Sequence, residues 1–123
     1  MQFNLAILPG DGVGPEVGDE GIKVLQAIGA KFGHTFNLEY GLVGGVAIDK
    51  EGTALSDETF KMCRDSDAVL LAAVGDPRYD DPQAKIHPED GLLKLRGGMG
   101  LFANLRPVKV FPPLVDNTNF RPE

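Results

Sequence analysis

The sequence is poor in cysteine, histidine and tryptophan: its 123 residues include one Cys, two His and no Trp. The single cysteine, Cys63, excludes an internal disulfide and is typical of a cytoplasmic protein. No motif that would activate a thiolate surrounds Cys63, so we expect a small buried apolar residue there. No apolar run approaches the roughly 18 residues of a membrane span. The first residues also lack the basic start and long apolar stretch of a signal peptide.

Positive charge is also scarce, with 12 Lys and Arg against 18 Asp and Glu and a net charge of −6. This balance argues against a nucleic-acid partner, because binding the phosphate backbone requires clustered cations. A small anionic substrate remains compatible with it, since one or two local arginines can bind a carboxylate. Hydrophobic residues make up 42% of the chain, an ordinary value for a globular domain.

The expected elements alternate between strand and helix, which is typical of an α/β fold with a parallel sheet and right-handed crossovers. Strands are expected over residues 3–8, 35–43, 68–74 and 101–111, and helices over about 15–32, 56–65 and 91–96. The unbroken apolar run 68–74 is typical of a central strand covered on both faces. The first helix is expected to end at Gly33 and to have its apolar positions at Val17, Gly21, Val24, Leu25, Ile28 and Phe32.

A glycine-rich loop with Gly10, Gly12 and Gly14 joins the first expected strand to the first helix. Glycines let a backbone approach a ligand closely, and a helix N-terminus favours an anion. The Rossmann fingerprint, however, is G-x-G-x-x-G, whereas the spacing in this loop is G-x-G-x-G. Pro15 also removes a backbone donor. The sequence disfavours a conventional dinucleotide loop and leaves open a plain tight turn or a ligand-facing loop of another kind.

Two arginines, Arg96 and Arg106, lie on separate expected elements, one on a helix and one within an apolar strand. An unpaired charge buried in such a strand is costly, so Arg106 needs a partner. Guanidinium groups bind carboxylates in a bidentate way, and two converging arginines therefore suit a dicarboxylate. Judged by spacing alone, surface salt bridges explain the pair equally well. Gly97 and Gly98, directly after Arg96, lower the helix propensity by about 2 kcal/mol together.

Three segments, 8–16, 44–49 and 101–107, resemble the 3-isopropylmalate dehydrogenases, which belong to the isocitrate/isopropylmalate family of β-decarboxylating dehydrogenases. The similarity runs from about residue 3 to residue 123. It implies an α/β fold in which helices flank a sheet in three layers, and of which this chain is an incomplete N-terminal part. Residues 1–100 would belong to a first domain that binds cofactor and substrate, and residues 101–123 would begin a second domain.

The resemblance also implies roles for individual residues. Arg96 and Arg106 match the first two substrate arginines, which hold the malate carboxylates. Leu92 and Leu93 match the pocket for the isopropyl group, and burial of each methylene there contributes about 0.8 kcal/mol, which favours 3-isopropylmalate over isocitrate. Glu89 matches an acidic residue between the substrate and the nicotinamide ribose. The residues that match the cofactor's nicotinamide end are Val13, Asp76, Pro77, Arg78, Tyr79, Asp80, Asp81, Pro82, Gln83, Ala84, Lys85, Ile86, His87, Pro88 and Glu89.

In that family NAD accepts a hydride and Mg²⁺ or Mn²⁺ polarises the substrate oxygen. The metal ligands, a third substrate arginine, and the lysine and tyrosine that handle protons all follow residue 123 in family order. We therefore expect no catalytic or metal-binding residue in this chain, weak stability, exposed apolar surface, and no turnover by the chain alone. His34, His87 and the pair Asp80 and Asp81 are expected to be solvated loop residues. The full-length protein is expected to act in leucine biosynthesis as a cytoplasmic homodimer; a tartrate or homoisocitrate dehydrogenase and a non-catalytic binding module are the alternatives.

Overall fold

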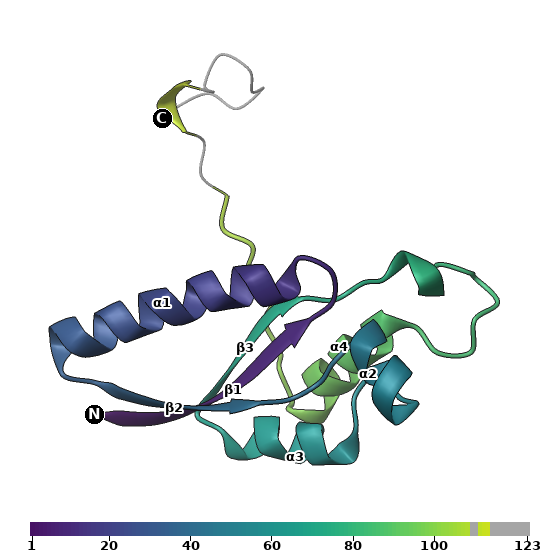
Figure 1. The fold of residues 1–123 in the computed structure, drawn as a ribbon, viewed down its shortest axis with the longest axis horizontal. Coiled ribbons are helices and arrows are strands. Elements are labelled where there is room, and N and C mark those ends of the chain that lie inside the picture. Colours follow the sequence, from purple (N-terminus) through teal and green to yellow (C-terminus); the bar gives the residue numbers. More distant parts are fainter. Residues whose placement is uncertain (109–110, 114–123) are drawn as a thin grey trace.

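The computed structural model describes residues 1–108 and 111–113. The strands of these residues form one parallel sheet with the order β2-β1-β3, made of β1 (Gln2–Gly10), β2 (Thr35–Tyr40) and β3 (Ala68–Ala73). The helices are α1 (Gly14–Phe32), α2 (Gly45–Glu51), α3 (Asp57–Asp65), the short 3₁₀ turn η1 (Pro77–Tyr79) and α4 (Pro88–Gly98). This arrangement, drawn in Figure 1, confirms the predicted α/β class.

The central strand β1 separates two apolar clusters. Its side chains alternate between the two faces of the sheet, as the pleat of a strand requires. Ile7 packs with Ile22 of α1 on one face, while Leu8 packs with Leu55 and Leu95 on the other. Helix α1 therefore covers one face, and α2, α3 and α4 gather on the opposite side (Figure 1). The sheet is the middle of three layers.

The side of helix α1 that contacts the sheet matches the prediction only in part: Leu25 packs against the Ile7 cluster and Gly21 lies next to Leu70, as expected. The buried positions of α1 are Gly14, Gly18, Ile22 and Gly29. The large apolar residues Val17, Val24, Ile28 and Phe32 are exposed instead. A Cβ added at Gly14 would collide with the Pro9 carbonyl oxygen, so glycine lets the start of the helix approach β1 closely. The predicted stop is confirmed, because Gly33 has a φ of 69° and its amide donates to the Gly29 carbonyl.

One prediction about a strand was wrong in part, and another was wrong. β3 forms as expected and has apolar cover on both faces, because Leu71 packs on one cluster and Leu70 on the other. It is not central, however: in the part of the chain that the structure describes it pairs with β1 alone. Residues 101–108 form no strand and are exposed, with Phe102 fully accessible. The physical reason is that no described strand lies beside them to satisfy their backbone groups. Residue 111 is likewise not in a strand, and residues 109–110 of the predicted strand lie outside the described residues.

Two helices also differ from the prediction. Helix α2 was not expected, because no element was predicted between the strand that ends at residue 43 and the helix that begins at about residue 56. Gly44, with a φ of 84°, precedes its first turn. Helix α4 starts at Pro88 and continues through both glycines at its end. A Cβ added at Gly98 would lie 2.5 Å from the ring of Phe60. The glycine that costs helix propensity thus lets the end of α4 pack against α3.

Candidate functional site

The carboxyl ends of β1 and β3 lie side by side. Gly10 is paired with Ala73, and the amide of Asp11 donates a hydrogen bond to the Ala73 carbonyl at 2.9 Å. The carboxylate of Glu89, at the start of α4, lies 3.5 Å from the point where a Cβ on Gly75 would be. The loop after β1, the segment after β3 and the first turn of α4 therefore meet at one edge. Open parallel sheets bind ligands at this edge.

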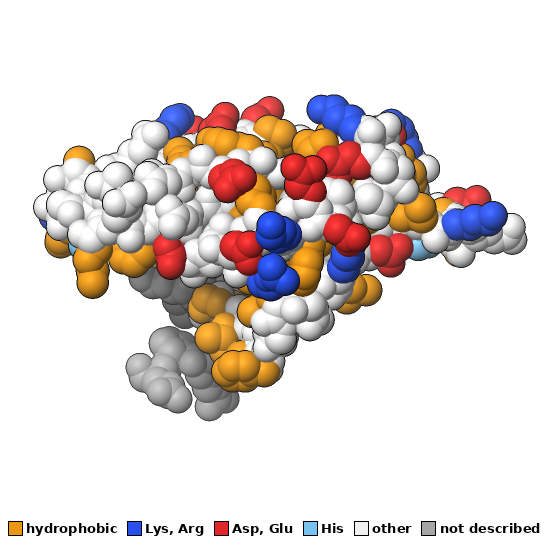
Figure 2. Space-filling view, turned by 90° about the horizontal axis from the view of Figure 1, so that it is seen from below, with side chains coloured by type: hydrophobic (Ala, Val, Ile, Leu, Met, Phe, Trp, Pro, Cys, Tyr) orange, Lys and Arg blue, Asp and Glu red, His pale blue; other side chains and the backbone are white. Residues whose placement is uncertain are grey.

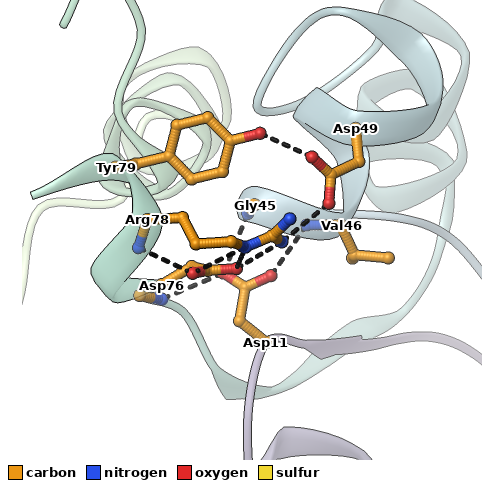
Figure 3. Close-up of polar contacts among 8 residues, drawn as sticks. Asp11, Gly45, Val46, Asp49, Asp76, Arg78 and Tyr79 are labelled. Carbon is orange, nitrogen blue, oxygen red and sulfur yellow. Dashed lines mark hydrogen bonds and ion pairs between the residues drawn. The ribbon is translucent and has the colours of Figure 1, made fainter.

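Asp11 is the buried centre of this edge, and the sequence analysis did not single it out. Its carboxylate accepts hydrogen bonds from the amides of Gly45, Val46 and Gly75 at 2.9, 2.9 and 3.0 Å (Figure 3). A Cβ on Gly44 would lie 2.2 Å from the same carboxylate, so the close approach requires glycine there. The glycine-rich loop thus contributes a buried carboxylate that is surrounded by backbone from residues 44–46 and Gly75, and this negative charge argues against a phosphate-binding loop. The sequence signal that could have pointed to Asp11 is its position between two glycines, directly after the first strand.

A second polar network joins α2 to the segment after β3. The guanidinium of Arg78 donates from Nε to Asp76 at 3.0 Å and from Nη2 to both Asp76 and Asp49, at 2.6 and 2.7 Å. The hydroxyl of Tyr79 donates to the other oxygen of Asp49 at 2.7 Å (Figure 3). These four residues, Asp49, Asp76, Arg78 and Tyr79, are called the clasp below.

The clasp shifts the ionisation of its members in the directions that favour the charged pairs. The Tyr79 hydroxyl and the Arg78 guanidinium together lower the pKa of Asp49. Arg78 lowers the pKa of Asp76 through its side chain and its backbone amide. The two carboxylates raise the pKa of Arg78, and Asp49 raises that of Tyr79. At neutral pH the clasp therefore holds two carboxylates around one cation.

The rest of the predicted cofactor segment is mostly exposed and locally bonded. Asp81 accepts a hydrogen bond from the amide of Gln83 at 2.9 Å, and both Asp80 and Asp81 are exposed as predicted. The prediction for His87 was wrong. It is half-buried, its Nδ1 lies 3.1 Å from the Tyr79 carbonyl, and it precedes the first turn of α4 as the capping residue.

The prediction for His34 was also wrong. Its ring is half-buried in the turn between α1 and β2, next to the rings of Phe3 and Phe32, with centroid distances of 5.9 and 6.5 Å. Cys63, by contrast, is fully buried as predicted, and burial raises the pKa of its thiol.

Helix α4 presents two distinct sides. Pro88, Gly91 and Leu95 are buried against the rest of the chain. The other side carries the predicted ligand residues at spacings of three or four positions, which places them next to one another on a helix. These residues are Glu89, Leu92, Leu93 and Arg96. Leu92 is half-buried, whereas the other three are exposed, with Leu93 at 62%.

Arg96 lines a shallow hollow of about 210 Å³ together with residues 101–105. The chain turns back after α4, and the amide of Leu101 donates to the Arg96 carbonyl at 3.1 Å. Arg106 follows this hollow directly in sequence and is exposed. Within residues 1–108 and 111–113, neither guanidinium takes part in an ion pair. The structure thus joins Leu92, Leu93 and Arg96 on one helix, while Arg106 lies on the following extended segment.

The described residues provide no metal site. Among residues 1–108 and 111–113, no three side chains of His, Cys, Asp or Glu are placed to hold a metal ion together. Within the same residues, no helix has both the length and the apolar character needed to cross a membrane. Figure 2 shows acidic and basic side chains interspersed on one face of the molecule, with apolar side chains exposed between them.

The fold and the site define a parallel α/β unit whose polar loops gather at the carboxyl edge of its sheet. Residues 4–123 match the isocitrate/isopropylmalate dehydrogenase family, and the chain belongs to that family of oxidoreductases. Over 123 residues it is 64% identical to the 3-isopropylmalate dehydrogenase of Dehalococcoides mccartyi (strain CBDB1). It is 52% identical to that of Anaeromyxobacter dehalogenans (strain 2CP-C) over the same length.

The chain spans about a third of the length of these relatives: all of it aligns, but it covers 34% and 35% of the two proteins. Among solved structures, it resembles the apo form of a beta-decarboxylating dehydrogenase from Thermococcus kodakarensis, with 32% identity and a TM-score of 0.62. That match covers 81% of this chain and 27% of the other. The family and the incomplete α/β fold that the sequence motifs predicted are confirmed.

Proposed function

We propose that this chain forms the N-terminal part of an enzyme that oxidatively decarboxylates 3-isopropylmalate to 2-oxoisocaproate with NAD, a step in leucine biosynthesis. The observation that carries the proposal is the outward side of α4. This side carries the carboxylate of Glu89, two leucines and the guanidinium of Arg96 along one helix. Among the described residues, that guanidinium forms no ion pair. The names of the similar bacterial proteins support the same reaction.

The proposed roles follow from the chemistry of these side chains. Arg96 and Arg106 would bind the two malate carboxylates, because guanidinium groups form charge-assisted hydrogen bonds with them. Leu92 and Leu93 would pack against the isopropyl group, and its burial would contribute on the order of 2 kcal/mol at about 0.8 kcal/mol per carbon. An additional carboxylate, as in isocitrate, would face these leucines without a partner, which is unfavourable.

The cofactor would lie at the carboxyl edge of the sheet. Bound NAD would supply the hydride acceptor. The residues present fit its nicotinamide end. Val13 is exposed at the N-terminus of α1, and Gly75 has no side chain that would keep a ligand away from the backbone. The Glu89 carboxylate, next to Gly75, can accept hydrogen bonds from ribose hydroxyls. The segment from Asp76 to Glu89 would cover this end.

Mg²⁺ or Mn²⁺ does not fit any cluster of the described residues, and no role is assigned to these residues in binding it. In this proposal the metal ligands and the proton-transferring groups belong to the remainder of the full-length protein, a cytoplasmic homodimer. This chain by itself would provide only part of the substrate-binding residues and would show no turnover.

The test is a substrate comparison with the full-length protein. NADH formation is measured with 3-isopropylmalate, isocitrate, homoisocitrate and tartrate, and 3-isopropylmalate is expected to have the highest kcat/KM. A higher kcat/KM for homoisocitrate or tartrate would assign the protein to one of those relatives. Absence of turnover with all four substrates would support a non-catalytic binding module instead.

The Leu93→Ala variant tests the pocket itself. We expect kcat/KM for 3-isopropylmalate to fall roughly tenfold relative to that for unsubstituted malate, because a few lost apolar contacts change discrimination by about that factor. The matched control is Val24→Ala, which truncates a similarly exposed residue on α1 and should leave the ratio unchanged. An unchanged ratio in Leu93→Ala would remove Leu93 from the pocket.

A further inference from the structure

We infer that Arg78 is a positioning residue that ties the segment from Asp76 to Glu89 to α2. Arg78 also sets how tightly the protein holds the nicotinamide end of NAD; this second role rests on the proposed function. Neither role requires Arg78 to touch a ligand.

The clasp joins parts of the chain that are distant in sequence. One guanidinium nitrogen of Arg78 lies between a carboxylate oxygen of Asp49, 29 positions away, and one of Asp76. The first turn of α2 is in close contact with the same residues, since a Cβ added at Gly45 would lie 2.9 Å from the Cβ of Asp76 and 3.3 Å from the Tyr79 ring. The Asp76 side chain is only 17% exposed, whereas that of Arg78 is 63% exposed. Arg78 therefore closes the clasp from its solvent side.

Beyond the clasp, few of the described hydrogen bonds connect the segment to the rest of the protein. The hydrogen bonds described for residues 80–86 remain within the segment, as in the bonds that Asp81 accepts from Gln83 and Ala84. At its far end the segment is held by the cap of α4, where the His87 amide donates to Asp90 at 2.8 Å. At its near end the Gly75 amide bonds to Asp11. Between Gly75 and His87, the described side-chain bonds that reach another element are those of the clasp, from Arg78 and Tyr79 to Asp49 of α2.

The chemistry of the clasp requires arginine. The planar guanidinium donates to Asp76 from two nitrogens and can still reach Asp49, whereas a lysine ammonium is a single point charge on a flexible stem. Exposed ion pairs contribute little to global stability. Loss of Arg78 should therefore loosen the segment locally and leave the fold intact, because regions with few buried contacts open independently of the core.

The experiment uses the full-length protein without ligand and compares Arg78→Gln with the unsubstituted protein. Hydrogen exchange of residues 80–87 is expected to become several-fold faster, and so is cleavage after the exposed Lys85 by a lysine-specific protease. The melting temperature should change little. Arg64→Gln is the matched control, because Arg64 makes a similarly exposed ion pair, with Asp65 on α3, and its loss should leave the segment unchanged.

Two further variants separate the clasp from a general loss of charge. Asp49→Asn should accelerate exchange in the same segment, and adding it to Arg78→Gln should have little further effect, because both changes break one network. Arg78→Lys should give an intermediate rate. Additive effects of Asp49→Asn and Arg78→Gln, or unchanged protection in Arg78→Gln, would overturn the inference.

The proposed effect of Arg78 on NAD binding is tested by steady-state kinetics. If Arg78→Gln leaves the segment in place about a tenth of the time, the apparent KM for NAD should rise roughly tenfold, with a much smaller change in kcat. Faster exchange with an unchanged KM for NAD would overturn the proposed effect of Arg78 on NAD binding. If the unsubstituted protein shows no NAD-dependent turnover, the proposed function fails instead, and the exchange comparison still decides whether Arg78 holds the segment.

Discussion

Asp11 and Gly75 are 64 positions apart in the sequence, yet the amide of Gly75 donates a hydrogen bond to the Asp11 carboxylate at 3.0 Å. The same buried carboxylate receives the amides of Gly45 and Val46. One side chain thus connects the end of β1, the first turn of α2 and the loop after β3. The loops of the proposed site are positioned relative to one another by this aspartate.

Replacement of Asp11 should therefore be strongly destabilising. Asp11→Ala leaves three backbone amides without their acceptor, and each such loss costs about 1–3 kcal/mol. We expect the free energy of unfolding of the full-length protein to fall by roughly 3 kcal/mol or more, with a smaller loss for Asp11→Asn, which retains one acceptor oxygen. Urea denaturation measures the change. Asp19→Asn, on the exposed side of α1, should stay within about 0.5 kcal/mol, and an equally small effect at Asp11 would contradict its role.

Two glycines of α4 should respond in opposite directions to the same substitution. A Cβ at Gly91 would lie 2.5 Å from the Ala54 carbonyl oxygen, so Gly91→Ala forces backbone to move, at a cost of about 1–3 kcal/mol. A Cβ at Gly97 would have no described atom within 4 Å outside the neighbouring backbone of its own helix, and Gly97→Ala should stabilise the helix by up to about 1 kcal/mol. Melting temperatures of the two variants are the measurement. A stabilised Gly91→Ala would show that α4 does not pack closely against Ala54.

Local features of the fold were predictable from the sequence. Ser56 was expected at the start of a helix, and its hydroxyl accepts a hydrogen bond from the Thr59 amide at 3.3 Å in the structure. Gly33 ends α1 as predicted, because a left-handed residue at a helix end favours glycine. The apolar run of β1 was correctly interpreted as a buried strand. In each case the physical cause lies within a few residues.

Features set by distant partners were not predictable in this way. Which side of α1 is buried depends on where glycines face the sheet, and a search for large apolar residues overlooks these positions. Whether residues 101–108 form a strand depends on a neighbouring strand, and the apolar pattern alone does not provide one. The role of Asp11 depends on amides from two other loops, and that of Arg78 on Asp49. Arg96 and Arg106 were candidates from the sequence itself, with surface salt bridges as the alternative, whereas Leu92 and Leu93 were found only through resemblance; the roles of all four are proposals.

Cys63 provides a pH-dependent prediction. Burial raises the pKa of its thiol above the ordinary value of about 8.5, so the folded protein keeps the proton where the unfolded chain loses it. The stabilising contribution of the neutral thiol is therefore complete below pH ~8.5 and is lost as pH rises above that value. Thiol alkylation at pH ~8 should be as slow as unfolding. Rapid alkylation of the native protein would contradict the burial. Cys63→Ala should remove this pH-dependent component.

The central claim is that two arginines of this chain hold the carboxylates of a branched dicarboxylate, and kcat/KM for 3-isopropylmalate tests it most directly. In the full-length protein, Arg96→Gln and Arg106→Gln should each lower kcat/KM by roughly 10- to 100-fold, because hydrogen bonds to charged groups contribute about 1.5–3 kcal/mol. The KM for NAD should change far less, and Arg64→Gln should match the unsubstituted protein. If either Arg96→Gln or Arg106→Gln retained unchanged kcat/KM for 3-isopropylmalate, the account would be contradicted.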